Sequence, residues 1–333
     1  MSVRTAAQRF GIGRTCYRLW YRPAGFVNRA LSEGLAETWL TARGRQAMRA
    51  AASRLPRCTK IPDGNVPVCF LTGHKFWEQT AFCAWSLMQA SNRVFPWIVF
   101  DDGSLSHIEQ AALRRVLGGH TRWVTPREAE DTLNRVLPSS RFSALRTRRL
   151  LYPNLRKLVD VHALSGGPKL VLDSDLLFFK RPDSLLGWLE EPAHPIAMRD
   201  CQESYGHPRK WLESIAGASL PECINVGICG FDSSTLDWNR IEHWLRALEE
   251  RGTSYYDEQA LLAMIFATGP HSILPRQYVC LPSAEEIKRP TATLHHYVAQ
   301  AKHRYFRDAW RCALGTHGVS GLSLEPHITA ASS

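Results

Sequence analysis

Short apolar segments alternate with longer amphipathic segments between residues 66 and 173. The apolar segments have the length and the aliphatic content of buried strands, and they lie at 66–72, 95–100, 120–124 and 169–173. The segments between them have the spacing of helices, and they lie at 76–91, 107–117, 126–136 and 144–165, the last interrupted near Pro153. Strands that alternate with helices predict an α/β fold, with a mostly parallel central sheet flanked by helices.

The alternation weakens after residue 175. Strands are predicted at 195–199 and 223–231, and helices at 237–250 and 255–267. The last residues are rich in Ser and Ala, which predicts a loose C-terminal tail over 316–333. The globular domain is therefore expected to span 61–315, a length that one embellished α/β domain accommodates.

Residues 1–60 form a different region, rich in Arg and Ala with interleaved aromatic residues. They hold 12 of the 41 Lys and Arg residues but 2 of the 31 Asp and Glu residues, so they carry a charge of +10, which is the net charge of the whole chain. The globular part is therefore neutral, which argues against a nucleic-acid-binding protein. Pro23 and Gly44 are expected to divide this basic N-terminal extension into short helical pieces.

The basic extension allows two main interpretations. Basic amphipathic helices suit an anionic membrane surface, but a helical extension can also pack on the domain with its arginines in water. An Arg-rich, acid-poor start also resembles an organelle transit peptide. The sequence has no signal-peptide core, no apolar run of the roughly 18–20 residues that span a bilayer, and no Cys-x-x-Cys motif among its nine cysteines. We therefore expect a cytoplasmic protein with reduced thiols, with a peripheral membrane location if the extension binds lipid.

Two carboxylates follow the fourth apolar segment. Asp173 and Asp175 lie between apolar residues on both sides, where an unpaired charge is costly. Residues two positions apart in an extended chain point to the same side, so both carboxylates can face one point. Hard divalent cations prefer oxygen ligands. An Asp-x-Asp sequence arises by chance in a chain of this length, but its place at the end of a strand indicates a metal site.

Polar residues also follow the first two predicted strands. Thr72 and Gly73 end the first, and Asp101 and Asp102 end the second, although the latter two also suit an ordinary turn. Ligands of open α/β sheets bind beyond the carboxyl ends of the strands. The three strand ends therefore predict a single site.

Five sequence features in a fixed order give the chain a family resemblance over about residues 66–310. They are the Thr72-Gly73 strand end, the basic pair Arg156-Lys157 before Val171-Leu-Asp-Ser-Asp175, the segment Ile224-Asn-Val-Gly-Ile228, the triplet Asp257-Glu-Gln259, and His296 followed by Lys302. In this order they resemble GT-A fold glycosyltransferases, of the glycogenin-like and bacterial lipopolysaccharide-galactosyltransferase type. The family's His-x-x-Gly-x-x-Lys element keeps its spacing here, but Ala299 replaces the glycine and the usual Pro-Trp after the lysine is missing.

The resemblance implies a donor site for a nucleotide-diphosphate sugar, with UDP as the favoured nucleotide. Asp173, Asp175 and His296 would hold Mn²⁺ or Mg²⁺ on the diphosphate, with adjacent His295 as a rival ligand and Asp173 as an alternative ribose contact. Lys302 and either Arg156 or Lys157 would contact the same phosphate oxygens. The base and ribose would bind near Thr72, Gly73, Asp101 and Asp102.

The resemblance also implies a sugar and acceptor side. Asp200, Asn225 and Asp257 are its candidates, and a carboxylate there can act as general base on the acceptor hydroxyl. Structural roles compete with each assignment. Asp257 and its neighbour Glu258 suit the start of a helix through the helix dipole, Asn225 can bond within a strand bend, and Arg156-Lys157 can lie on a solvated face.

These features together predict a metal-dependent glycosyltransferase that moves a sugar to a glycan or lipid-linked hydroxyl acceptor, with a lean towards retention of the anomeric configuration. One alternative is a sugar-phosphate nucleotidyltransferase, but residues 72–77 lack the Gly-x-Gly-Thr-Arg-type loop that such enzymes carry. The other alternative is an inactive scaffold or binding protein with the same fold. Both aspartates, His296 and Lys302 are present, which argues against the loss of activity.

Overall fold

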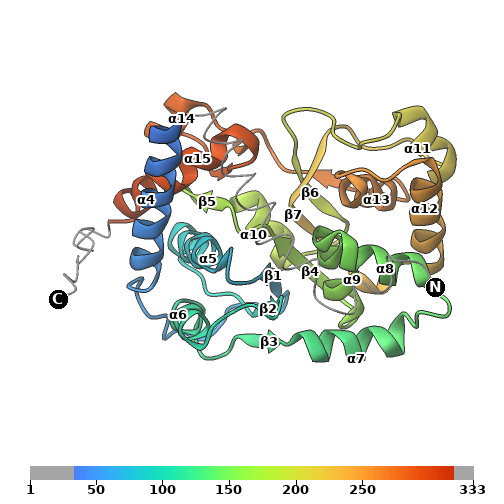
Figure 1. The fold of residues 1–333 in the computed structure, drawn as a ribbon, viewed down its shortest axis with the longest axis horizontal. Helices are drawn as coiled ribbons and strands as arrows, with labels where there is room; N and C mark the ends of the chain where they lie inside the picture. Colours follow the sequence, from blue (N-terminus) through green and yellow to red (C-terminus); the bar gives the residue numbers. More distant parts are fainter. Residues whose placement is uncertain (1–33, 319–333) are drawn as a thin grey trace.

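The computed structural model describes residues 34–318, which form two sheets and the helices around them (Figure 1). The larger sheet has seven strands in the order β3-β2-β1-β4-β7-β6-β8. These strands are β1 (Val68–Thr72), β2 (Trp97–Asp101), β3 (Arg122–Val124), β4 (Pro168–Leu172), β6 (Ile196–Arg199), β7 (Ile224–Asp232) and β8 (Ser272–Ile273). Only β7 runs against the other strands, because it pairs antiparallel with both β4 and β6.

The smaller sheet lies beside the end of β4. Its strands are β5 (Leu176–Phe178), β10 (Leu294–His296) and β9 (Tyr278–Cys280), in that order. β10 pairs antiparallel with β5 and parallel with β9. None of these three-residue strands was predicted, because such short segments carry no clear periodic pattern.

Helices form at every segment between residues 76 and 267 where the pattern predicted one. The structure has α5 (Trp77–Ser91), α6 (His107–Leu117), α7 (Pro126–Val136), α8 (Ser143–Leu151), η2 (Pro153–Leu155), α9 (Arg156–Ala163), α12 (Trp238–Arg251) and α13 (Asp257–Phe266). The break predicted near Pro153 therefore separates α8 from α9. The helices that were not predicted are α10 (Asp183–Glu190), α11 (Arg209–Ala216), η3 (Ser233–Thr235), α14 (Ala284–Lys288), η4 (Ala299–Ala301), α15 (Lys302–Arg304), η5 (Tyr305–Ala309) and α16 (Trp310–Thr316).

The centre of the large sheet is covered on both faces, so β1 and β2 are buried almost throughout rather than alternating. Phe70 and Val99 belong to a core that includes side chains of α5, α6 and α16. Cys69 and Phe100, one position along each strand, point the other way and pack with side chains of α7 and α9. The helical layers hold the strands rigidly, which positions the carboxyl edge of the sheet.

The end of the basic extension is one helix, α4 (Leu35–Ala52), and the predicted break at Gly44 is wrong. A Cβ atom at Gly44 would lie 2.5 Å from the Phe306 carbonyl oxygen, so glycine allows α4 to approach η5. Met48 at the buried face of α4 joins the main core. Arg45 and Arg49 both pair with the buried Glu78 of α5.

The described part of the extension therefore packs on the domain. The other interpretations of residues 1–60 concern mainly residues 1–33, which lie outside the described residues, as does most of the predicted tail. Over residues 34–318, no helix is both long and apolar enough to cross a membrane.

Candidate functional site

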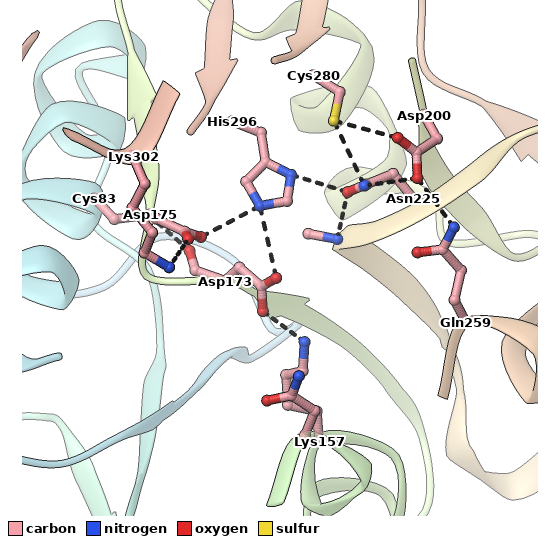
Figure 2. Close-up of polar contacts among 12 residues, drawn as sticks. Cys83, Lys157, Asp173, Asp175, Asp200, Asn225, Gln259, Cys280, His296 and Lys302 are labelled. Atoms are coloured by element: carbon pink, nitrogen blue, oxygen red, sulfur yellow. Dashed lines mark hydrogen bonds and ion pairs between the residues drawn. The ribbon is translucent and has the colours of Figure 1, made fainter. Parts of the chain in front are cut away.

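Three strands bring polar side chains to one edge of the large sheet. β4 ends at Leu172 and is followed by Asp173, and β6 ends at Arg199 and is followed by Asp200. Because β7 runs in the opposite direction, its first residues lie at this same edge, and Asn225 pairs with Met198 of β6. The reversed strand is therefore what places Asn225 beside the two aspartates (Figure 2).

The smaller sheet brings His296 to the acidic pair. β5 begins directly after Asp175, and its first residue, Leu176, is the partner of His296 in β10. The Tyr297 backbone nitrogen also donates to the Asp175 carbonyl oxygen at 3.0 Å. These contacts bring His296 next to the acidic pair, although the two are far apart in the sequence.

Asp173, Asp175 and His296 form a cluster with the donor atoms of a metal site. The His296 Nε2 atom lies 3.2 Å from Asp175 Oδ1 and 3.7 Å from Asp173 Oδ2. All three ligand atoms lie within 4.8 Å of one another. Carboxylate oxygens suit Mn²⁺ and Mg²⁺, whereas an imidazole nitrogen suits first-row transition metals, so this donor set favours Mn²⁺ over Mg²⁺.

The second nitrogen of His296 fixes the orientation of its ring. Nδ1 lies 2.9 Å from the Asn225 Oδ1 atom, which can only accept, so Nδ1 carries a proton (Figure 2). Nε2 then faces the two carboxylates, so a metal ion between them would meet its lone pair. Histidine ligands of metals usually donate their other N–H in this way. The residues present therefore fit a divalent cation.

His295, the rival ligand, lies elsewhere. Its Nδ1 atom is 2.9 Å from the Tyr297 hydroxyl and its Nε2 atom is 2.9 Å from Glu286 Oε1. Neighbouring residues of a strand point to opposite faces, so the register of β10 decides which histidine meets the acidic pair. Both ring nitrogens of His295 are engaged on the far side.

Each aspartate of the pair also has a lysine partner. Lys157 Nζ lies 2.6 Å from Asp173 Oδ1, and Lys302 Nζ lies 2.9 Å from Asp175 Oδ2 (Figure 2). Burial opposes ionisation of Asp175, but the charge of Lys302 and the contact with His296 outweigh it and hold the pKa of this carboxyl well below its ordinary value. The charge of Asp175 in turn raises the pKa of Lys302. Both lysines were predicted contacts of the diphosphate.

Glu258 lies beside the acidic pair, although it was not among the predicted site residues and its place after Asp257 suited a helix start as well as a catalytic role. Its Oε1 atom lies 3.3 Å from Lys157 Nζ, in nearly complete burial. Burial raises the pKa of Glu258 to about 7, and the charge of Asp173 acts in the same direction, against that of Lys157. A carboxyl group that titrates near neutral pH can accept or release a proton under working conditions.

Asp200 lies on the other side of Asn225. Its Oδ2 atom accepts from Asn225 Nδ2 at 3.2 Å and from Gln259 Nε2 at 3.0 Å, and its Oδ1 atom lies 3.4 Å from Cys280 Sγ. Asn225 therefore connects His296 to Asp200 (Figure 2). Gln259 and Cys280 were not predicted. Gln259 could have been predicted from the triplet Asp257-Glu-Gln259, whereas no motif contains Cys280.

Two predicted residues have structural partners away from the acidic pair. Asp257 is fully buried, where Arg148 lies 2.8 Å from Oδ2 and His207 lies 3.1 Å from Oδ1. Arg156 pairs with Asp160, one turn along its own helix, at 2.8 Å. Of the predicted pair Arg156-Lys157, Lys157 is therefore the residue that contacts the acidic pair.

The predicted nucleotide side lies at the ends of β1 and β2. Thr72 Oγ1 is 2.8 Å from Thr80 Oγ1. Asp101 and Asp102 accept from the backbone nitrogens of Gly103 and Ser104 at 2.8 and 2.9 Å. A Cβ atom at Gly73 would lie 2.2 Å from the Asp102 carboxylate, so the two strand ends approach closely here. Asp101 and Asp102 therefore stabilise a turn. Binding of a nucleotide at these residues stays a prediction.

Two solved structures share this fold over most of the chain. A galactosyltransferase, LgtC, in complex with donor and acceptor sugar analogs matches with a TM-score of 0.51 at 17% identity, over 79% of this chain and 98% of that chain. The apo form of mouse xyloside xylosyltransferase 1 matches with a TM-score of 0.51 at 13% identity, over 72% of this chain and 99% of that chain. No protein-family model and no curated protein matches the sequence. The fold predicted from the sequence, a mostly parallel α/β sheet of the GT-A type flanked by helices, is confirmed.

Proposed function

We propose that this protein is a metal-dependent glycosyltransferase that moves a sugar from a nucleotide-diphosphate sugar, UDP-linked, to a hydroxyl group of a glycan or lipid-linked acceptor. One observation carries the proposal. Within a GT-A fold, Asp173, Asp175 and His296 converge at the carboxyl edge of the sheet, and a lysine lies beside each aspartate. The LgtC structure of the same fold contains donor and acceptor sugar analogs, which supports both kinds of ligand here.

The cluster would hold Mn²⁺ or Mg²⁺ through Asp173, Asp175 and His296. When bound there, a cation would supply positive charge to stabilise the diphosphate leaving group. Asn225 orients the His296 ring by accepting from Nδ1, so that Nε2 faces the cation position. The main contribution of this chain is thus a prearranged set of donor atoms.

Lys157 and Lys302 would change partners when donor and cation bind. In the protein alone each ammonium group neutralises one aspartate. A cation at the carboxylates weakens these ion pairs, and the ammonium groups can then donate to phosphate oxygens. Lys302 is the more accessible of the two, with 42% of its side chain exposed, so it is the first candidate for the diphosphate.

The proton of the acceptor hydroxyl needs a base on the sugar side. We assign this role to Glu258, because its pKa is raised to about 7 by burial and it lies beside Lys157. Asp257 is assigned a supporting role, since both of its oxygens bind Arg148 and His207. Asp200, held by Asn225 and Gln259, is assigned to the hydroxyl groups of the donor sugar.

A thermal-shift screen of nucleotide sugars tests this function. With Mn²⁺ present, the matching donor should raise the melting temperature by a few degrees, because it binds only the folded state. The shift should disappear with a chelator and in Asp175→Asn. It should persist in Asp131→Asn, which changes an exposed aspartate of α7.

The outcome also separates an enzyme from a binding protein. Release of free nucleoside diphosphate in the presence of donor, and faster release with the right acceptor, would support catalysis. A metal-dependent shift without turnover would indicate a binding module and overturn the catalytic proposal. The absence of a metal-dependent shift with every nucleotide sugar would overturn the proposal entirely.

A further inference from the structure

A second cluster of metal-binding atoms lies next to the first. Asp200, Cys201 and Cys280 each offer one atom to it, and these atoms lie within 4.8 Å of one another. Asp200 and Cys201 follow β6 of the large sheet, while Cys280 ends β9 of the small sheet. The cluster therefore forms only where the two sheets meet, and Figure 2 shows two of its members, Asp200 and Cys280.

The carboxylate of this cluster is already oriented. Asp200 Oδ2 accepts from Asn225 Nδ2 at 3.2 Å and from Gln259 Nε2 at 3.0 Å. Its Oδ1 atom accepts from the Cys201 backbone nitrogen at 2.7 Å and lies 3.4 Å from Cys280 Sγ. Metal-bound carboxylates usually have such hydrogen-bond partners on their other oxygen. The side-chain amides of Asn225 and Gln259 thus orient the Asp200 carboxylate and do not bind the ion themselves.

One distance in the cluster is close to that of a tetrahedral zinc site. Zinc bonds of about 2.3 Å to sulfur and about 2.1 Å to oxygen place tetrahedral ligand atoms roughly 3.5 to 3.8 Å apart. The 3.4 Å between Asp200 Oδ1 and Cys280 Sγ is close to this value. Cys280 is buried and Cys201 is exposed, so an ion can enter from the solvent side.

The two clusters differ in chemical type. Asp173, Asp175 and His296 offer oxygen and imidazole nitrogen, which favour Mn²⁺ over Mg²⁺. Two thiolates and one carboxylate instead favour Zn²⁺, because thiolate sulfur selects softer cations. Three protein ligands also leave a fourth tetrahedral position for water or a substrate group.

We propose that Asp200, Cys201 and Cys280 form a second cation site, selective for Zn²⁺ and similar thiophilic cations, and separated from the Asp173, Asp175 and His296 cluster by Asn225. The site has a functional consequence that rests on the proposed glycosyltransferase activity. Asp200 cannot contact a donor sugar while it binds zinc, so Zn²⁺ inhibits transfer even when Mn²⁺ is saturating. The binding itself does not depend on that activity.

Cobalt titration of the fully reduced, full-length protein tests the site. Co²⁺ should bind with the near-ultraviolet absorption of sulfur-to-cobalt charge transfer, and Zn²⁺ should remove that absorption by displacement. In Cys201→Ser the absorption should fall. The affinity for Co²⁺ should drop by more than ~10–100-fold, which is the loss typical of removing a residue that only hydrogen-bonds a metal ligand. Cys201 is exposed, so this variant should fold, which its thermal melt checks.

Two further variants make the result specific. Cys223→Ser changes a half-exposed thiol outside the cluster and should keep the absorption. Asp175→Asn should also keep it while losing Mn²⁺ binding, so failure of the glycosyltransferase proposal is distinguishable from failure of this one. Absence of the charge-transfer absorption in the reduced wild-type protein overturns the proposal. So does an unchanged absorption in both Cys201→Ser and Cys280→Ala.

Discussion

Every charged side chain at the centre of the site has a partner inside the protein. Lys157 lies between Asp173 and Glu258, while Lys302 and His296 lie on two sides of Asp175. A divalent cation that arrives alone must therefore compete with ammonium groups. A cation that arrives with a diphosphate gives those lysines new anionic partners. We expect the two ligands to bind cooperatively for this reason.

Glu258 should make stability depend on pH near neutrality. Its pKa is raised from 4.5 to about 7 in the folded protein, mainly by burial. The folded state therefore holds a proton that the unfolded chain has released, and stability is lost as pH rises through about 7. Glu258→Gln cannot ionise. As the pH rises from 5 to 8, the free energy of unfolding of the wild-type protein should fall by about 2 kcal/mol more than that of Glu258→Gln.

Urea unfolding at several pH values, with a chelator present, measures this difference. Glu250→Gln, which changes an exposed glutamate of α12, is the matched control and should follow the wild-type pH profile. Parallel profiles for Glu258→Gln and wild type would show that Glu258 is not the buried acid that this assignment requires.

At the scale of single elements, the short strands decide what the site contains. The acidic pair was predictable because β4 is a strong apolar strand with charges at its end. The choice between His295 and His296 was not, because it depends on the register of the three-residue β10 against β5. The contribution of Asn225 likewise depends on β7 running antiparallel, which no local pattern reveals.

Helix α4 shows how tertiary contacts override local propensity. Glycine inside a helix costs about 1 kcal/mol relative to alanine, which is why Gly44 was expected to end it. The close approach of the Phe306 carbonyl explains its presence instead. Gly44→Ala should therefore destabilise the protein by about 1–3 kcal/mol, because the extra methyl group forces α4 away from η5.

Gly187→Ala is the matched control for that prediction. Gly187 is an exposed helical glycine in α10, and a Cβ atom there would meet nothing within 4 Å. The alanine should raise the free energy of unfolding by about 0.5–1 kcal/mol. Chemical denaturation compares the two variants. A stabilising effect of both substitutions would contradict the close packing of α4 against η5.

At the scale of the whole molecule, the two sheets have different origins in the sequence. The alternation from β1 to β4 is a strong local signal, and the order of helices and strands there was predicted well. The small sheet gathers Leu176, Tyr278 and Leu294 from distant parts of the chain. The pairing of its strands depends on long-range contacts, so the sequence pattern did not predict this sheet. The cluster of Asp173, Asp175 and His296 lies at the junction of the two sheets.

The most direct test of the central claim is a calorimetric titration of Mn²⁺ in the absence and presence of UDP. If Asp173, Asp175 and His296 hold a cation that bridges to a diphosphate, UDP should tighten Mn²⁺ binding at least about tenfold, which is about 1.4 kcal/mol. Asp175→Asn should lose this binding. Equal Mn²⁺ affinity with and without UDP, or unchanged binding in Asp175→Asn, would contradict the claim.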